Sequence, residues 1–159
     1  MDEPIDVLIE APLPPRGKDR PRMSRNGHVY TPAATKNWES ALAMMAQSKL
    51  PETIIDGPVR VDVLALMPRS QDMCKVYKRT GESKHSRDFI WHVKKPDGDN
   101  IRKAVLDALK AFWRNDSQVI AGDTVKSYTE IDGRPRVVVR IQTDLPSPRA
   151  VAEQLGLIP

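Results

Sequence analysis

Two aspartates stand one residue apart, at Asp97 and Asp99, directly after a Lys-Lys-Pro sequence and before an apparent helix. Carboxylate oxygens are the ligands that Mg²⁺ prefers, and Gly98 between the two acids permits a turned backbone on which both carboxylates converge. A third carboxylate, Asp116 in the segment RNDSQ, follows the same helix. The three side chains therefore predict a divalent-metal site.

The same pair also has an ordinary structural interpretation. Asp97 or Asp99 suits the N-cap of a helix, which stabilises a helix by about 1 kcal/mol. Asp99 and Lys103 are four residues apart, so they suit a surface ion pair worth about 0.2–0.5 kcal/mol. A cap needs only one aspartate and leaves the second unexplained. An EF-hand is excluded, because Ile101 and Ala108 stand where that loop needs ligands.

A helix at residues 99–113 is expected to position the pair. Its apolar residues recur at helical spacing and predict one buried face: Ile101, Val105, Ala108, Leu109 and Phe112. Asp99, Lys103 and Asp107 follow each other at intervals of four and form a polar stripe on the opposite side. Lys103 therefore shares a helix face with Asp99, and we expect Asp107 to be a solvated surface acid.

The remaining pattern predicts an α+β fold, a small mixed β-sheet with two main helices packed on one face. Strands are expected at residues 5–11, 59–67, 117–121, 124–131 and 135–143. Further helices are expected at residues 32–48 and 149–157. Asn26-Gly27 predicts a hairpin turn before a short strand. We expect one domain over residues 1–145 and a tail or short helix over residues 146–159.

Composition points to an ordinary soluble domain. The chain has 159 residues, 40% hydrophobic and 29% charged, which suits a modest core. No apolar run is long enough to span a bilayer, and the acidic start MDEPID lacks the apolar stretch of a secretory signal. The single cysteine, Cys74, forms no internal disulfide, and no Cys/His cluster has zinc spacing. The expected location is the cytoplasm, with no membrane association.

Positive charge is concentrated in two segments, although the formal net charge is only +4. Residues 12–36 carry six Lys or Arg against one acid, and residues 68–95 carry eight against three. Such segments suit a polyanion such as nucleic acid. The apolar residues of 68–92 show neither helical nor strand periodicity, so we interpret this segment as a mobile basic arm.

The three histidines, at 28, 85 and 92, are expected at the surface or on DNA rather than on a metal.

The sequence KPDGDNIRKAVLDAL, followed by NDSQVI, resembles the RusA-like family of Holliday-junction resolvases, small endonucleases of bacteria and their phages. The segment RPRMSRNGHVYTPAAT resembles the basic N-terminal segment of the same family. The resemblance covers residues 9–143. One position departs from the family pattern, which often has two aspartates before Ser/Ala-Gln, whereas this chain has Asn115-Asp116.

The resemblance implies a role for each matching residue. Asp97, Asp99 and Asp116 match the metal-binding aspartates, and Lys103 matches the catalytic lysine. Asn100 matches the asparagine beside the pair, where it can hydrogen-bond a ligating carboxylate or a water. The resemblance also implies a homodimer that uses Mg²⁺ or Mn²⁺ to cleave branched DNA, such as a four-way junction, in recombination and repair.

Phosphate contacts are expected from the basic residues Arg20, Arg22, Arg25, Lys94 and Lys95. Tyr30 and Trp91 can stack on bases, although single aromatic residues more often pack in a core. Two other functions remain open. One is a non-catalytic basic DNA-binding module whose acidic pair only caps a helix, and the other is a structural protein of a bacterium or phage that binds Mg²⁺ for stability. Cleavage of a labelled four-way junction with Mg²⁺, and not with EDTA, distinguishes the enzyme from both.

Overall fold

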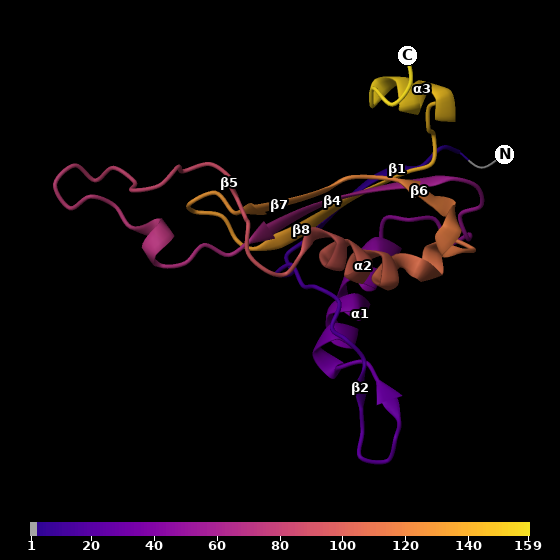
Figure 1. Ribbon diagram of the computed structural model, residues 1–159, viewed down its shortest axis with the longest axis horizontal. Coiled ribbons are helices and arrows are strands. Elements are labelled where there is room, and N and C mark those ends of the chain that lie inside the picture. The colour runs from indigo at the N-terminus through magenta and orange to yellow at the C-terminus, as the bar shows by residue number, and fades with distance from the viewer. Residues whose placement is uncertain (1–2) are drawn as a thin grey trace.

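A computed structural model describes residues 3–159, and its centre is a six-stranded mixed sheet in the order β1-β8-β4-β7-β5, with β6 also beside β4 (Figure 1). Its strands are β1 (Asp6–Ala11), β4 (Val59–Met67), β5 (Ile90–Trp91), β6 (Val119–Ala121), β7 (Thr124–Tyr128) and β8 (Arg136–Gln142). Two helices, α1 (Ala33–Gln47) and α2 (Gly98–Leu109), lie on one face of this sheet. The predicted α+β fold is confirmed.

Strand β4 is the central strand. It pairs antiparallel with β8 along one edge and parallel with β6 and β7 along the other. β6 and β7 follow one another along that edge, and Gly122 lies between them with φ near +137°. A Cβ atom at this position would stand 1.8 Å from the carbonyl oxygen of Val61, so only glycine fits.

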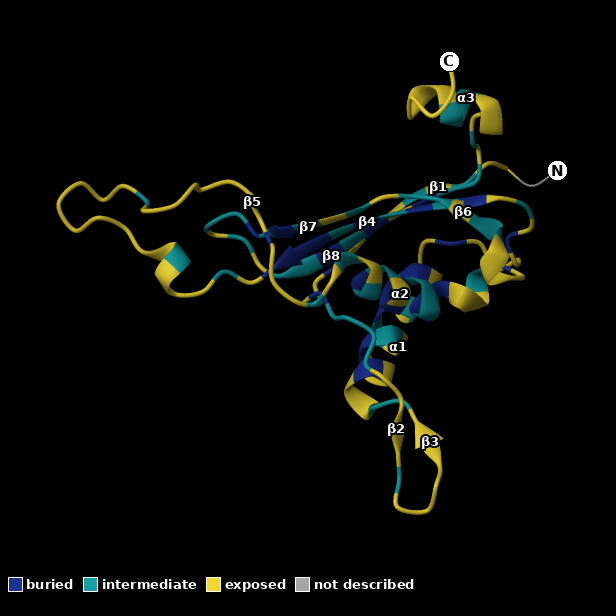
Figure 2. Cartoon of the chain, viewed as in Figure 1, coloured by how far each residue is buried: buried dark blue, intermediate teal, exposed yellow. Residues whose placement is uncertain are grey.

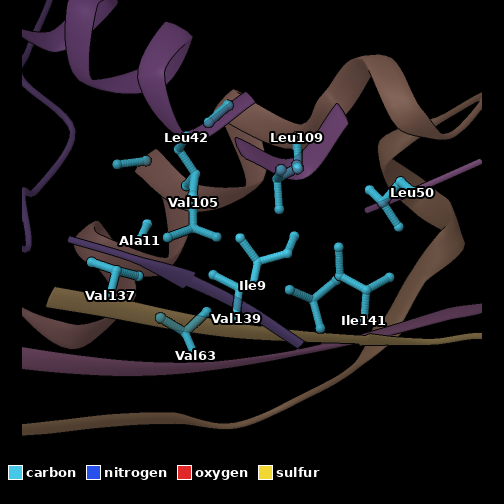
Figure 3. Close-up of a cluster of buried hydrophobic side chains, with 14 of the residues drawn as sticks. Ile9, Ala11, Leu42, Leu50, Val63, Val105, Leu109, Val137, Val139 and Ile141 are labelled. Atoms are coloured by element: carbon cyan, nitrogen blue, oxygen red, sulfur yellow. The ribbon is translucent and has the colours of Figure 1, made fainter. Parts of the chain in front are cut away.

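The core lies between the sheet and the two helices (Figure 3). Alternate residues of the strands, among them Val63 of β4 and Val139 of β8, point toward the helices, and Val105 and Leu109 of α2 meet them. Val105 and Leu109 are completely buried, as is Leu42 of α1. Burial of each such side chain stabilises the fold by about 1.5–3 kcal/mol, and this anchors the buried face of α2.

Several predicted boundaries differ from the structure, and three of the differences lie next to the expected site. The α-helix predicted to reach residue 113 ends at Leu109 and continues as a 3₁₀ turn, η2 (Lys110–Phe112). The strand predicted at 117–121 starts at Val119, because residues before it form another 3₁₀ turn, η3 (Asp116–Gln118). The strand predicted at 124–131 ends at Tyr128. Strand β4 occupies the predicted range 59–67.

Two segments extend away from the sheet and are mostly exposed (Figure 2). One is the hairpin of β2 (Arg22–Met23) and β3 (Val29–Tyr30) that the Asn-Gly turn predicts. The other is residues 68–89, which contain the 3₁₀ turn η1 (Asp72–Cys74); the arm was predicted to reach residue 92, but Ile90–Trp91 form β5 and pair with β7. The Arg69 guanidinium closes the base of the arm by donating to three carbonyl oxygens, those of Ser86, Asp88 and Thr129.

A third helix, α3 (Pro148–Gln154), stands on the side of the sheet opposite α1 and α2 (Figure 1). The helix predicted at 149–157 is therefore present but ends earlier, at Gln154. Within residues 3–159, no helix is long and apolar enough to cross a membrane.

Candidate metal and nucleic-acid site

The acidic pair lies at the start of α2 and is not used as a cap. Asp97 occupies the N-cap position, where its carbonyl oxygen accepts the N–H of Ile101 at 3.0 Å, but its side chain makes no capping hydrogen bond. Asp99 lies in the first turn, and both acids are exposed. Over residues 3–159 neither carboxylate takes part in an ion pair. Their oxygens are open to a ligand from solution.

Two half-buried basic side chains fix the start of α2 to the sheet. Lys126 of β7 donates from Nζ to the carbonyl oxygens of Lys94, at 2.6 Å, and Pro96, at 2.7 Å. Arg102 of α2 donates to the carbonyl oxygen of Val61 at 2.7 Å, and burial lowers the pKa of its guanidinium. The backbone that carries Asp97 is therefore held against β7 and β4.

The basic N-terminal segment packs directly on the first turn of α2. The N–H of Lys18 donates to the carbonyl oxygen of Asn100 at 3.1 Å. A Cβ atom on Gly17 would stand 2.7 Å from the Asn100 side-chain nitrogen, so the approach is close. Residues 17–18, which directly precede the segment RPRMSRNGHVYTPAAT, are therefore adjacent to the helix start that carries the acidic pair, about eighty residues further along the chain.

Asp107 is not the solvated acid that the helix pattern predicts. Its Oδ2 atom lies 2.8 Å from Nζ of Lys18, which also lies 2.6 Å from Oε1 of Glu39 on α1. Burial opposes the charge of Lys18, but the hydrogen bonds to Asp107 and Glu39 outweigh it and raise the Lys18 pKa. The prediction fails because the chain before α1 folds back over the polar side of α2, which helical periodicity alone does not show.

Lys103 lies on the exposed side of α2, one turn after Asp99. The surface ion pair that the four-residue spacing suggested does not form, since no carboxylate among the described residues lies within 4.0 Å of its ammonium group. Lys103 therefore remains free to meet an anion.

Asp116 lies at the other end of the helix, exposed in the turn η3. The twelve residues of α2 alone rise by about 18 Å at 1.5 Å per residue, so the ends of this helix are far apart. In residues 3–159, no three His, Cys, Asp or Glu side chains stand close enough to hold a metal ion together. The three carboxylates expected to share a metal therefore do not meet within one chain.

The departure from the family pattern at Asn115 has a structural role. Its side chain accepts the N–H of Ser117 at 2.9 Å, and its own N–H donates to Oε1 of Gln118 at 2.7 Å, which makes a capping box. The Gln118 amide nitrogen also donates to the carbonyl oxygens of Ile55 and Gly57. This network holds the turn that carries Asp116, and the Asn-x-x-Gln spacing was the signal in the sequence that could have identified it.

The expected phosphate-binding side chains are all exposed. They are Arg20, Arg22 and Arg25 on the N-terminal segment and its hairpin, and Lys94 and Lys95 before the acidic pair. Tyr30 and Trp91 are also exposed, Trp91 by 74%, so neither is a core residue.

His92 differs from the other two histidines, which are exposed. It is buried and makes a T-shaped ring contact with Tyr128, so the prediction of a surface position is wrong for it.

Comparison with known protein sequences shows the family of this chain. The family described as endodeoxyribonuclease RusA matches residues 12–142, which include the basic N-terminal segment, both ends of α2 and the strands from β4 to β8. A protein of Bacillus subtilis (strain 168), uncharacterized protein YqaN, is 37% identical over 132 residues, which cover 80% of this chain and 89% of that protein. This chain belongs to the RusA family of endodeoxyribonucleases.

Proposed function

We propose that this protein is a Mg²⁺-dependent endonuclease that cleaves branched DNA, with the four-way junction as its substrate, in recombination and repair. The observation that carries the proposal is the state of the acidic pair: Asp97 and Asp99 are exposed on a firmly anchored helix start, and the Asp97 side chain makes no capping hydrogen bond. A side chain that caps the helix would accept a backbone N–H, whereas a side chain that binds a metal ion must have its oxygens available. Its place of work is the cytoplasm of a bacterial or phage-infected cell, where such DNA is found.

The donors fit the metal. Exposed carboxylates are hard oxygen ligands that suit Mg²⁺, and Mn²⁺ takes similar ligands. A bound ion supplies a water of lowered pKa and polarises the scissile phosphate. Lys103, one helical turn from Asp99 and with no carboxylate partner among residues 3–159, directs its ammonium group to the negative charge that develops on the phosphate. Asn100, half-buried beside Gly17, orients a ligating carboxylate or a water.

Asp116 acts across a homodimer in this proposal. Within one chain it is separated from Asp97 and Asp99 by the length of α2. A two-fold axis near the middle of α2 brings the end of one helix beside the start of the other, and Asp116 of the second copy then completes the carboxylate set. Such a dimer has two equivalent sites, which suits two cuts in a symmetric junction.

Mixing two inactive variants tests this arrangement. Asp99→Asn and Asp116→Asn are each expected to bind a labelled four-way junction without cutting it. In a mixed dimer of the two variants, one site carries both substitutions and the other carries neither, so one strand is cut. After exchange of subunits, about a quarter of all sites are intact. Cleavage should need Mg²⁺ and stop with EDTA.

Each alternative outcome has a clear meaning. If either variant alone cuts at the normal rate, its aspartate is not part of the site. If the mixture is as inactive as its components, Asp116 does not act across a dimer. Junction binding with and without EDTA, with cleavage in neither, would support the non-catalytic DNA-binding module. That module is the weaker candidate, because it gives the acidic pair only a capping role, and the Asp97 side chain makes no capping hydrogen bond.

DNA binding is assigned to the exposed basic residues on both sides of the pair: Arg20, Arg22, Arg25, Lys94 and Lys95. Contacts of this kind position the phosphate backbone without reading its sequence. The exposed rings of Tyr30 and Trp91 offer flat surfaces for unpaired bases, which a branched substrate exposes.

A further inference from the structure

The arm of residues 68–89 extends from the sheet without a core of its own. None of these residues is buried, and every residue from Lys75 to Glu82 is exposed. A segment that buries so little apolar surface adds little to the stability of the domain. Contact with a partner therefore explains this segment better than a role in folding.

The outer part of the arm is a defined hairpin. The N–H of Tyr77 donates to the carbonyl oxygen of Glu82, and the N–H of Gly81 donates to the carbonyl oxygen of Tyr77, both at 2.8 Å. Gly81 adopts φ near +71°, which closes the turn without strain. Residues 78–81 are therefore the tip of the arm, and the backbone presents them in a set order.

The tip carries positive charge that no carboxylate neutralises. Residues 75–85 contain four Lys or Arg and one acid. Within residues 3–159, no carboxylate lies within 4.0 Å of the charged groups of Lys78, Arg79 and Lys84. The other cations of the arm are engaged by carbonyl oxygens or carboxylates: Arg69, Lys75 and Arg87. The three cations near the tip are thus available to an anion from outside the chain.

The base of the arm lies beside the expected metal site. The N–H of Ile131 donates to the carbonyl oxygen of Arg87 at 2.9 Å, which ties the arm to the turn between β7 and β8. Phe89 is followed directly by β5, which pairs with β7, and Asp97 comes eight positions after Phe89. Lys126 of the same β7 holds the backbone just before Asp97. The arm and the acidic pair therefore share one supporting strand.

The arm and the β2–β3 hairpin leave the domain in different directions (Figures 1 and 2). The arm extends along the long axis of the molecule, whereas the hairpin, with Arg22 and Arg25, extends from the side of the sheet that carries α1 and α2. A straight duplex does not follow both directions, because DNA is stiff over about 150 base pairs. Two helices that meet at a branch do diverge in this way.

We propose that the arm binds a second helix of the branched substrate, where Lys78, Arg79 and Lys84 contact the phosphate backbone while the β2–β3 hairpin contacts the first helix. The proposal rests on the function proposed above, since it takes branched DNA as the substrate. Phosphates match cations that lack a carboxylate partner, and their neutralisation releases counterions. The arm thereby favours branched over linear DNA.

The length of the arm limits where this contact falls. The ten residues from Arg69 to Arg79 span at most about 36 Å at 3.6 Å per residue, which corresponds to about ten base pairs of DNA. Because the base of the arm lies beside the acidic pair, the contact falls within about ten base pairs of the cut.

The test measures binding of the full chain to synthetic DNA by fluorescence anisotropy in EDTA, where no strand is cut. Lys78→Gln/Arg79→Gln is expected to weaken binding to a four-way junction at least about fivefold and to lower the salt slope by about 2, since two phosphate contacts are lost. Its affinity for a linear duplex should stay within about twofold of wild type, because the hairpin contacts one helix in both cases.

Two control variants separate charge at the tip from other effects. Lys49→Gln/Arg149→Gln removes two exposed cations outside the arm and the hairpin, so it changes the net charge equally but should bind the junction as wild type does. Lys78→Arg/Arg79→Lys keeps both charges at the tip and should also bind normally.

Junctions of different size give a second readout. Shortening each helix of the junction from about 20 to about 6 base pairs should lower the affinity of wild type, because the tip then extends past the end of the DNA. The glutamine variant lacks the contact and should lose much less affinity on shortening. The Lys49→Gln/Arg149→Gln control should respond as wild type does.

The proposal is overturned if the glutamine variant binds the junction as tightly as wild type, or if it loses equal affinity for the junction and the duplex. An equal response of variant and wild type to shortening also overturns it. Cleavage with Mg²⁺ tests the nuclease function separately. If wild type binds the junction but does not cut it, that function fails, whereas the comparison of arm variants in EDTA keeps its meaning.

Discussion

Nζ of Lys18 lies 2.8 Å from Oδ2 of Asp107, although 89 residues separate them. The same ammonium group contacts Glu39 of α1, and the backbone N–H of Lys18 donates a hydrogen bond to the carbonyl oxygen of Asn100. One half-buried lysine thus joins α1, α2 and the basic N-terminal segment beside the acidic pair. It holds the expected DNA-binding segment in a fixed relation to the expected metal ligands.

Replacing this lysine should destabilise the fold. Lys18→Met leaves two half-buried carboxylates without a partner, and we expect a loss of about 1–3 kcal/mol in the free energy of unfolding. Urea denaturation measures it. The matched control is Lys75→Met, whose pair with Asp72 at 2.9 Å is exposed and should contribute less than about 0.5 kcal/mol. Equal losses in the two variants would contradict a structural role for Lys18.

Lys103 should matter for the chemical step rather than for binding. Lys103→Met is expected to lower the single-turnover rate of junction cleavage by about 10²–10³-fold, because a charge that stabilises the transition state is lost. Junction affinity should change much less. Lys49→Met removes an exposed lysine just after α1 and serves as the control for charge alone. A loss of affinity that accounts for the whole effect would make Lys103 a simple phosphate contact.

Arg22 on the β2–β3 hairpin should contribute one phosphate contact. Arg22→Ala is expected to reduce the slope of log K against log salt by about 1, since one fewer counterion is released on binding. Fluorescence anisotropy at several salt concentrations measures the slope. Arg149→Ala, on the opposite side of the sheet, should leave the slope unchanged. An unchanged slope in Arg22→Ala would mean that Arg22 does not contact a DNA phosphate.

His92 should make stability depend on pH. Burial, and then the charge of Lys126, lowers the pKa of its imidazole below the usual value. The unfolded chain therefore binds a proton before the folded chain does. The stability present above the ordinary histidine pKa, about 6.5, is lost as pH falls toward the folded pKa.

Urea denaturation at pH about 7.5 and about 5.5 measures this loss, and His92→Phe should reduce it because phenylalanine cannot bind the proton. Phenylalanine also keeps the ring contact with Tyr128. A pH dependence equal to that of wild type would mean that other groups cause it.

Local patterns account for most of the secondary structure. The buried stripe of α2, with Ile101, Val105 and Leu109, is visible in the sequence because a helix repeats every 3.6 residues. Strand ends were less predictable. The Asn115 capping box turns residues 116–118 into η3, and this side-chain network competes with the apolar pattern that suggested a strand.

By itself, the sequence determined which residues are proposed to carry the chemistry, because the spacing of Asp97, Asp99, Lys103 and Asp116 resembles the family pattern. The tertiary structure alone decided how they are arranged. A continuous helix holds its two ends apart, so Asp116 cannot join the acidic pair within one chain. The pairing of Lys18 with Asp107 was likewise decided by how a loop packs on a helix, and contacts between distant residues leave no local period in the sequence.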